Sequence, residues 1–126
     1  MPYILDSKAD ISDTSWVDDL EVTPADVVRA FGGPPRRGDP RKVSGLYSFV
    51  DGGRVFTLYD WKSTSLWDDD LPSPLAFWNS RVSEVLMIGG NDDDIGGFVS
   101  WLVGRVRAAG RSNSTLQRTR AGGPRP

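Results

Sequence analysis

The chain has 126 residues, the length of one domain, and it contains neither cysteine nor histidine. These two absences exclude disulfides, Cys/His zinc sites, iron–sulfur centres, a cysteine nucleophile and any histidine-based triad. The formal net charge is −2. Residues 104–126 hold six arginines and no acid, so residues 1–103 carry a net charge of −8. A protein that binds duplex DNA needs a basic surface on its folded part, and this charge distribution does not provide one.

No apolar run approaches the roughly 18 residues that a membrane span needs. The opening sequence MPYILDSKAD lacks the charged and then apolar form of a signal peptide. We therefore expect a soluble cytoplasmic protein that has no membrane partner.

The first residues show little hydrophobic periodicity, so residues 1–15 are expected to form a flexible arm. An ordered stretch is expected to begin at Trp16. Residues 23–26, Thr-Pro-Ala-Asp, predict a helix start, with Thr as the N-cap, Pro at the first helical position and an acid that suits the helix dipole. Gly32 and Gly33 are expected to end this short helix.

Apolar residues then recur with a period of two, which predicts a β-hairpin with strands over 43–50 and 54–61. Between them, residues 51–53, Asp-Gly-Gly, supply the positive-φ residues of a tight turn. Both strands are apolar on both faces for part of their length. We therefore expect a helix to cover one face of the sheet and other chain segments to cover the opposite face.

The connection over 62–80 is long and carries aromatic residues, and Ser73-Pro74 predicts one turn of helix within it. A third strand is predicted over 82–88. The longest helix is expected to begin at Asn91 or Asp92. Its buried face is predicted from apolar residues at i, i+3, i+4, i+7 and i+11, which are Ile95, Phe98, Val99, Leu102 and Val106.

These elements predict an α+β protein, in which a short N-terminal helix and a long C-terminal helix pack on a small antiparallel β-sheet. Residues 16–109 are expected to form the single domain. The segment 110–126 is basic, polar and rich in glycine and proline, which predicts a disordered tail.

Two runs of three aspartates are the acidic clusters that could bind a hard cation such as Mg²⁺. Residues 92–94 lie at an expected helix start, where the dipole stabilises acids, and residues 68–70 lie in an expected loop. Neither run has the spacing of an EF-hand loop. We expect no metal site and no cofactor.

Five tryptophans exceed what a core of this size needs. Trp61 and Trp101 are assigned to the core, whereas Phe77 and Trp78, in the long connection, are interpreted as exposed stacking residues. An excess of aromatic residues also suits a subunit interface.

The segment Gly89-Gly90-Asn91, between a predicted strand and a predicted helix, fits either a phosphate-binding turn or a sharp structural turn. Arg54, Arg105 and Arg107 are the candidate phosphate partners. Each also has a purely structural interpretation, because cations are favourable near a helix C-terminus and Arg54 opens an exposed strand.

Three motifs occur in order: FGGPP at 31–35, LYSFVDGGRVFTLYDWKST at 46–64 and MIGG at 87–90, followed by an amphipathic helix. The ordered set resembles the small phage-encoded anti-defence proteins that act as sponges for the signal of the bacterial Thoeris immune system, the first type described. The resemblance covers roughly residues 20–108. Where that family often has Trp or His before the IGG turn, this chain has Leu86 and Met87.

The resemblance implies a protein that is not an enzyme. Such proteins bind cyclic ADP-ribose isomers and release them unchanged on denaturation, which starves the immune effector of its signal in the host cytoplasm. Some also hold cyclic oligonucleotides at separate arginine-lined sites. They assemble as dimers or higher oligomers with pockets between protomers.

The residue types agree in outline with such a ligand, since a base needs an aromatic platform and phosphates need arginine or main-chain N–H groups. The candidate ligand-binding residues are Phe77, Trp78, Asn91, Arg54, Arg105 and Arg107. Because residues 91 and 105 are about 21 Å apart along a helix axis, we expect two classes of site. One is at Asn91 with Phe77 or Trp78 as its wall, and the other is lined by the arginines.

Two other functions stay open. The exposed tryptophans and acidic body could serve a protein-binding adaptor or an inhibitor of a host protein. The paired carboxylates could serve a metal-dependent phosphodiesterase.

Overall fold

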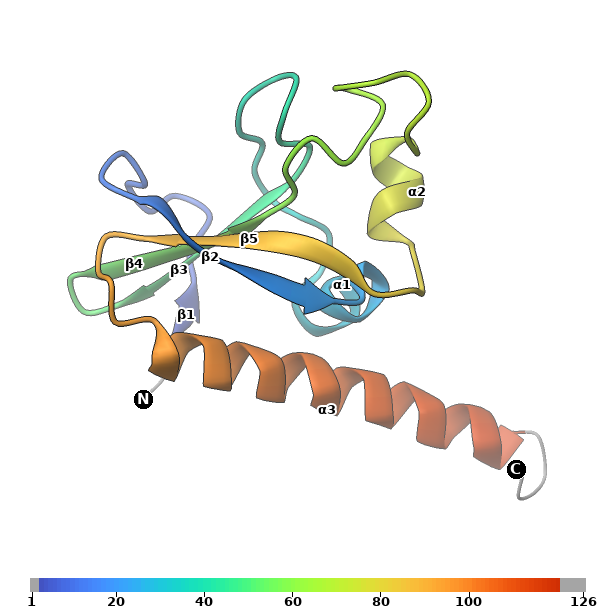
Figure 1. Cartoon of the computed structure of the whole chain (residues 1–126). Helices are drawn as coiled ribbons and strands as arrows, with labels where there is room; N and C mark the ends of the chain where they lie inside the picture. Colours follow the sequence, from blue (N-terminus) through green and yellow to red (C-terminus); the bar gives the residue numbers. More distant parts are fainter. Residues whose placement is uncertain (1–2, 121–126) are drawn as a thin grey trace.

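The computed structural model describes the backbone of residues 3–120 and the side chains of residues 3–110. The described part of the chain forms five strands and three helices in the order β1-β2-α1-β3-β4-α2-β5-α3 (Figure 1). The strands are β1 (Ile4–Leu5), β2 (Ser15–Val22), β3 (Leu46–Asp51), β4 (Arg54–Tyr59) and β5 (Glu84–Gly90). The helices are α1 (Pro24–Phe31), α2 (Pro74–Trp78) and α3 (Gly96–Arg120).

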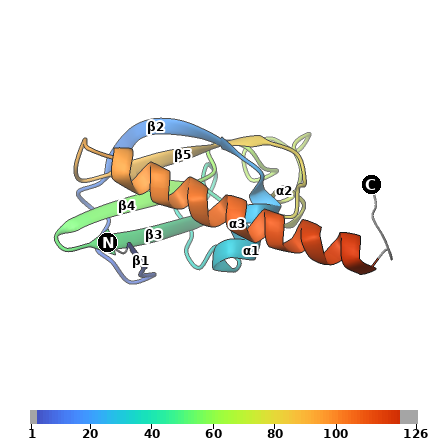
Figure 2. The same cartoon turned by 90° about the horizontal axis from the view of Figure 1, so that it is seen from below.

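The strands form one sheet in the order β1-β3-β4-β5-β2, and all of its neighbouring strands are antiparallel. The helix α3 runs across one face of this sheet, with α1 beside it (Figures 1 and 2). The predicted α+β class and the packing of the long C-terminal helix on the sheet are thereby confirmed. No helix of the described residues is long and apolar enough to cross a membrane.

The core lies between the sheet and α3. The predicted buried face of the helix is confirmed, because Phe98, Leu102 and Val106 are buried there. The rings of Phe98 and Phe56 stack with their centroids 4.6 Å apart. Trp101 packs against the same cluster, as predicted.

The local elements follow their sequence signals closely. Helix α1 begins at Pro24 after Thr23 and ends at Gly32, whose φ of 86° is one that glycine adopts without strain. The predicted hairpin is β3 and β4, joined through Gly52 with a φ of 63°. The predicted helical turn after Ser73 is α2, and the Ser73 hydroxyl caps it by accepting from the Ala76 N–H at 3.1 Å.

The N-terminal segment differs from the loose arm that the sequence predicted over 1–15. Ile4–Leu5 forms β1, which pairs with β3, and the ring of Tyr3 lies 5.5 Å from Phe98 and 5.8 Å from Phe56. A strand of two residues is too short to show periodicity, so no pattern could predict it. Packing of Tyr3 on the core orders this end of the chain.

Gly89 and Gly90 do not lie in a turn, although the sequence predicted either a phosphate-binding turn or a sharp structural turn there. Gly89 and Gly90 are the last residues of β5, and the strand runs two residues beyond the predicted end at Ile88. A Cβ at Gly89 would lie 2.6 Å from the Thr57 hydroxyl oxygen and 3.0 Å from the Ser15 carbonyl oxygen. The close approach of the neighbouring strands therefore accounts for glycine at position 89.

Helix α3 begins at Gly96, four or five residues after the predicted start at Asp92 or Asn91. It continues to Arg120, so its backbone is helical beyond the predicted domain end at 109 and through part of the segment predicted to be disordered. The rest of that segment, 121–126, lies outside the described residues.

Candidate functional site

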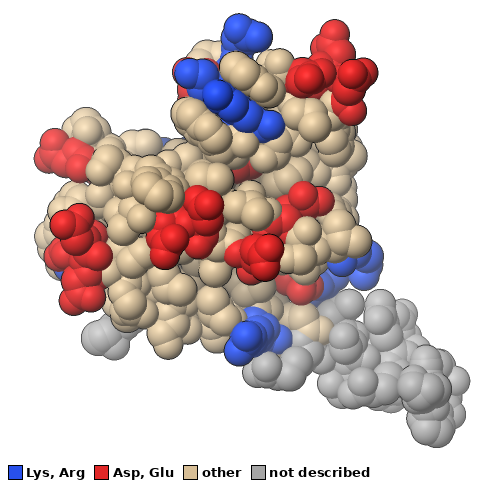
Figure 3. All heavy atoms as spheres, in the orientation of Figure 1, with Lys and Arg blue, Asp and Glu red and all other residues tan. Residues whose placement is uncertain are grey.

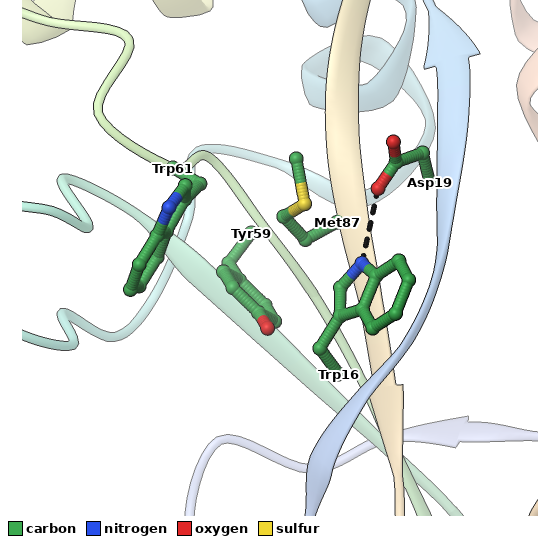
Figure 4. A pocket seen from close by; sticks show the side chains of 5 residues that line it. All are labelled: Trp16, Asp19, Tyr59, Trp61 and Met87. Carbon is green, nitrogen blue, oxygen red and sulfur yellow. Dashed lines mark hydrogen bonds between the residues drawn. The ribbon is translucent and has the colours of Figure 1, made fainter.

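A groove lined by aromatic side chains lies on the face of the sheet opposite α3. It is formed by Trp16, Asp19, Tyr59, Trp61 and Met87, and it has a volume of about 360 Å³ (Figure 4). Alternation along β4 sends Phe56 and Leu58 into the core and leaves Tyr59 and then Trp61 on the outer face. Tyr59 pairs with Met87 in β5, which in turn pairs with Asp19 in β2.

A β-bulge places Trp16 in the groove. Residues 16 and 19 are three apart and would point to opposite faces of a regular strand. The register shifts between Trp16 and Asp18, so that Trp16 lies opposite Gly89 while Asp19 lies opposite Met87. Both side chains consequently reach the outer face, and the Trp16 indole N–H donates to the Asp19 carboxylate at 3.0 Å (Figure 4).

The two tryptophans stand on either side of Tyr59 and Met87 (Figure 4). Trp16 is 56% exposed and Trp61 is 40% exposed, which is unusual for rings that bury so much apolar area when they pack. Burial and the nearby Asp19 charge raise the pKa of Tyr59, so its phenol stays neutral and can donate a hydrogen bond.

The carboxylate of Asp60, next to Trp61 in the chain, is buried and holds the backbone at this end of the groove. Asp60 is fully buried and accepts hydrogen bonds from the Ser44 and Gly45 N–H groups and from the Ser44 hydroxyl, all at 2.8–2.9 Å at their closest. The Trp78 indole N–H donates to the same hydroxyl at 3.1 Å. Burial raises the pKa of Asp60, and its hydrogen bonds with Gly45 and Ser44 oppose that shift.

The structure contradicts the prediction that Phe77 and Trp78 form an exposed stacking wall. Both side chains are buried in the core cluster, at 3% and 6% exposure. Helix α2 is a single amphipathic turn that turns these two rings inward and leaves Leu75 facing solvent. Composition showed that aromatic residues were in excess, but it could not show which of them would face outward.

The other four predicted ligand residues lie on separate elements. Asn91 follows β5, and its side-chain oxygen accepts from the Val55 N–H at 2.8 Å while its amide donates to the Gly53 carbonyl at 3.1 Å. Arg54 forms an ion pair with Asp51 at 2.6 Å beside the same hairpin turn. Arg105 and Arg107 lie on α3.

The two α3 arginines have different surroundings. The guanidinium of Arg105 lies over the rings of Phe31 and Trp101, with its central carbon 5.3 Å and 5.4 Å from their centroids. Arg107 lines a separate shallow cavity with residues of β2 and the start of α1. The first of the two predicted sites is therefore not formed, because Asn91 is hydrogen-bonded at the hairpin turn beside Arg54, whereas Phe77 and Trp78 are buried in the core.

Sequence reasoning missed four groove residues and assigned the fifth, Trp61, to the core. The sequence did contain a signal for Tyr59 and Trp61. The alternation of the strand places them on the face of the sheet that Phe56 and Leu58 do not occupy. The bulge that turns Trp16 outward left no sequence signal.

The chemistry of the groove suits binding of a flat, partly apolar molecule. Its lining is three aromatic rings, one thioether and one carboxylate that is already hydrogen-bonded to an indole. The described residues contain no group of three or more acidic side chains placed to hold a metal ion. A scan against known protein families and a search of curated proteins both find no match to this chain.

The hydrogen bonds of the Asn91 side chain with the β3–β4 hairpin give a testable prediction. Asn91→Ala removes the two side-chain hydrogen bonds with Val55 and Gly53 and keeps the backbone hydrogen bond from the Asn91 N–H to the Val55 carbonyl. This change should lower the free energy of unfolding by about 1–2 kcal/mol. Urea denaturation measures the change, and Asn79→Ala, a second exposed asparagine away from the hairpin, is the control. Unchanged stability together with a loss of ligand affinity would instead assign Asn91 to a binding site.

Proposed function

We propose that this protein binds a nucleotide signal of the cyclic ADP-ribose class in the aromatic groove and sequesters it without cleavage. The single observation that carries the proposal is the open groove with two exposed tryptophans and a tyrosine on the uncovered face of the sheet. The function itself is the one that the resemblance to the Thoeris anti-defence family implies. It would act on the signal in the host cytoplasm.

The groove offers what a purine needs. Stacking of a base on an aromatic side chain contributes about 1–3 kcal/mol, and it requires an exposed ring face such as those of Trp16 and Trp61. The Asp19 carboxylate can accept a hydrogen bond from an exocyclic amine at the side of the groove. The volume of about 360 Å³ is at the small end of ligand pockets and suits one base with its ribose.

The lining also supports sequestration over catalysis. A hydrolytic site needs a nucleophile or an activated water next to a base. Here the one carboxylate, Asp19, is held by the Trp16 indole, and the remaining lining groups are rings and a thioether. A molecule bound in this groove should therefore leave it chemically unchanged.

Assembly into a dimer or a higher homo-oligomer is part of the proposal. Several large apolar side chains of the described surface are exposed: Ile4, Trp16, Trp61, Leu66, Trp67, Leu75, Val82 and Val85. A second copy could bury some of this area. The β2 edge is bulged and carries the acids Asp18, Asp19 and Glu21, which protects it from strand pairing, so a contact would use other surfaces.

The test is uptake and recovery. The purified protein is incubated with cyclic ADP-ribose isomers, separated from free ligand by filtration and heated, and the released material is identified by mass spectrometry. Intact ligand is the expected result. Cleaved ligand would show an enzyme, and the absence of uptake would favour the alternative, an adaptor whose exposed tryptophans bind a host protein.

A further inference from the structure

We propose that Arg41, Lys42 and Lys62, which lie against Trp61 and Trp67, form an anion subsite for the phosphates of a nucleotide whose base stacks in the groove. This inference rests on the proposed function and deepens it. It assigns the residues that would bind the phosphates of such a ligand, whereas the groove alone would accept an uncharged nucleoside equally well.

The cations gather around two indole rings. The Lys62 ammonium lies 4.4 Å from the centroid of Trp67 and 5.7 Å from that of Trp61. The Lys42 ammonium lies 5.5 Å from the Trp61 centroid, and the Arg41 guanidinium carbon lies 5.3 Å from the Trp67 centroid. Attraction to the ring faces holds these flexible side chains in place before a ligand arrives.

Trp61 connects the subsite to the groove. It lines the groove and is also the ring that both lysines approach. The loops that carry the cations follow α1 and β4 and rise above the outer face of the sheet (Figure 1). Figure 3 shows lysine and arginine side chains together on that raised part of the surface, next to a group of acidic side chains, with further acidic side chains on the surface below.

Among the described side chains, none of these three cations forms an ion pair. The ion pairs within the described side chains are Arg29–Asp26 and Arg54–Asp51, and neither involves the three cations of the subsite. The nearest acid by sequence, Asp39, accepts hydrogen bonds from the N–H groups of Arg41 and Lys42. These bonds, together with the positive charges of Lys42 and Arg41, lower the pKa of Asp39, so Asp39 offsets part of the positive charge of the subsite. Asp68, Asp69 and Asp70 follow Trp67 in the neighbouring loop and limit how far the positive surface extends.

The backbone at Lys62 supports a functional role. Lys62 has a φ of 57° and is the only non-glycine residue with a positive φ in the described chain. A left-handed conformation costs an ordinary residue about 1–2 kcal/mol, so a position with purely structural demands would favour glycine. The Lys62 N–H donates to the Lys42 carbonyl at 2.8 Å, which ties the two lysine-bearing segments together.

The experiment compares ADP with adenosine by titration calorimetry at low salt. Because charge-assisted contacts are strong, wild-type protein should bind ADP at least about tenfold more tightly than adenosine. In the double variant Lys42→Gln/Lys62→Gln this ratio should fall to about threefold or less, while adenosine affinity stays unchanged. Lys8→Gln, an exposed lysine on the N-terminal segment, is the control and should keep the wild-type ratio.

A second variant separates binding from folding. Lys62→Gly removes the ammonium and relieves the left-handed backbone, so the melting temperature should stay the same or rise while the ADP preference falls. If the preference survives both variants, the anion subsite is refuted although the groove remains a nucleoside site. If wild-type protein binds neither adenosine nor ADP but takes up a cyclic ADP-ribose isomer, the subsite is refuted and the proposed function stands. If it takes up none of these ligands, the proposed function itself fails.

Discussion

Replacing Asp60 by alanine should destabilise the fold by about 3 kcal/mol or more, which is the largest stability effect that we predict for any polar side chain of this protein. Two backbone N–H groups, those of Ser44 and Gly45, would lose their acceptor, and each unsatisfied buried donor costs about 1–3 kcal/mol. The Ser44 hydroxyl would lose its acceptor as well.

Asp60→Asn is the matched variant and should cost no more than about 1 kcal/mol. Its carbonyl oxygen can accept from the Ser44 and Gly45 N–H groups, which both approach Oδ1 of Asp60. Its amide nitrogen replaces Oδ2 and can donate to the Ser44 hydroxyl oxygen. Urea denaturation of the three proteins measures both effects, and an equal loss in the two variants would show that the negative charge itself is required.

The difference in stability between wild type and Asp60→Asn should depend on pH, because the pKa of Asp60 is raised. Burial makes the folded state bind the proton more tightly than the unfolded chain does, so ionisation of Asp60 costs stability. The contribution of the protonated group is fully present below the ordinary value of 3.8 and is lost as the pH rises through the folded-state pKa. The stability of Asp60→Asn relative to wild type should therefore increase with pH across that window.

The comparison with the asparagine variant also removes the effect of other acids. The pKa values of Asp10 and Asp39 are lowered by hydrogen bonds with Ser12 and with the Arg41 and Lys42 backbone, so their contributions change with pH in the opposite direction. Those contributions are common to both proteins and cancel in the difference. A difference that is flat with pH would mean that Asp60 has an ordinary pKa.

Elements whose signals are local could be predicted from the sequence. The Thr-Pro start and Gly-Gly end of α1, the Asp-Gly-Gly turn of the hairpin and the apolar stripe of α3 are each encoded within a few residues. Features that depend on contacts distant in sequence could not be predicted. The packing of Tyr3 on Phe98 and the hydrogen bonds of Asn91 with the hairpin turn are examples.

The candidate site shows the same division. Asp60 follows Phe56 and Leu58 at a spacing of two, so the alternation of the strand predicts that its side chain faces the core. A charged residue at such a position is itself a signal of a structural or functional role. By contrast, Trp16 enters the groove only because a bulge changes the phase of β2. Phe77 and Trp78 were misjudged because a five-residue helix has too few positions to show which face is buried.

Removing either exposed tryptophan should weaken ligand binding strongly while leaving the fold intact. If the base stacks between Trp16 and Trp61, each alanine substitution removes about 1–3 kcal/mol of stacking, which is about fivefold to 150-fold in affinity for adenosine. Because both rings lie on the outer face and keep a large exposed area, 56% for Trp16 and 40% for Trp61, each variant should unfold at close to the wild-type urea concentration. Leu75→Ala is the control, since Leu75 is 75% exposed on α2 and does not line the groove.

A conservative variant resolves what Trp16 contributes. Trp16→Phe keeps a ring for stacking but removes the indole N–H that holds Asp19 at 3.0 Å. If that hydrogen bond orients the carboxylate toward an exocyclic amine, the phenylalanine variant should bind inosine as wild type does and bind adenosine more weakly, because inosine lacks the amine. If Trp16→Ala and Trp61→Ala both bind adenosine with wild-type affinity, the groove is not the site. Ligand binding would then have to lie elsewhere on the protein, with the hairpin turn beside Asn91 and Arg54 as the next place to test.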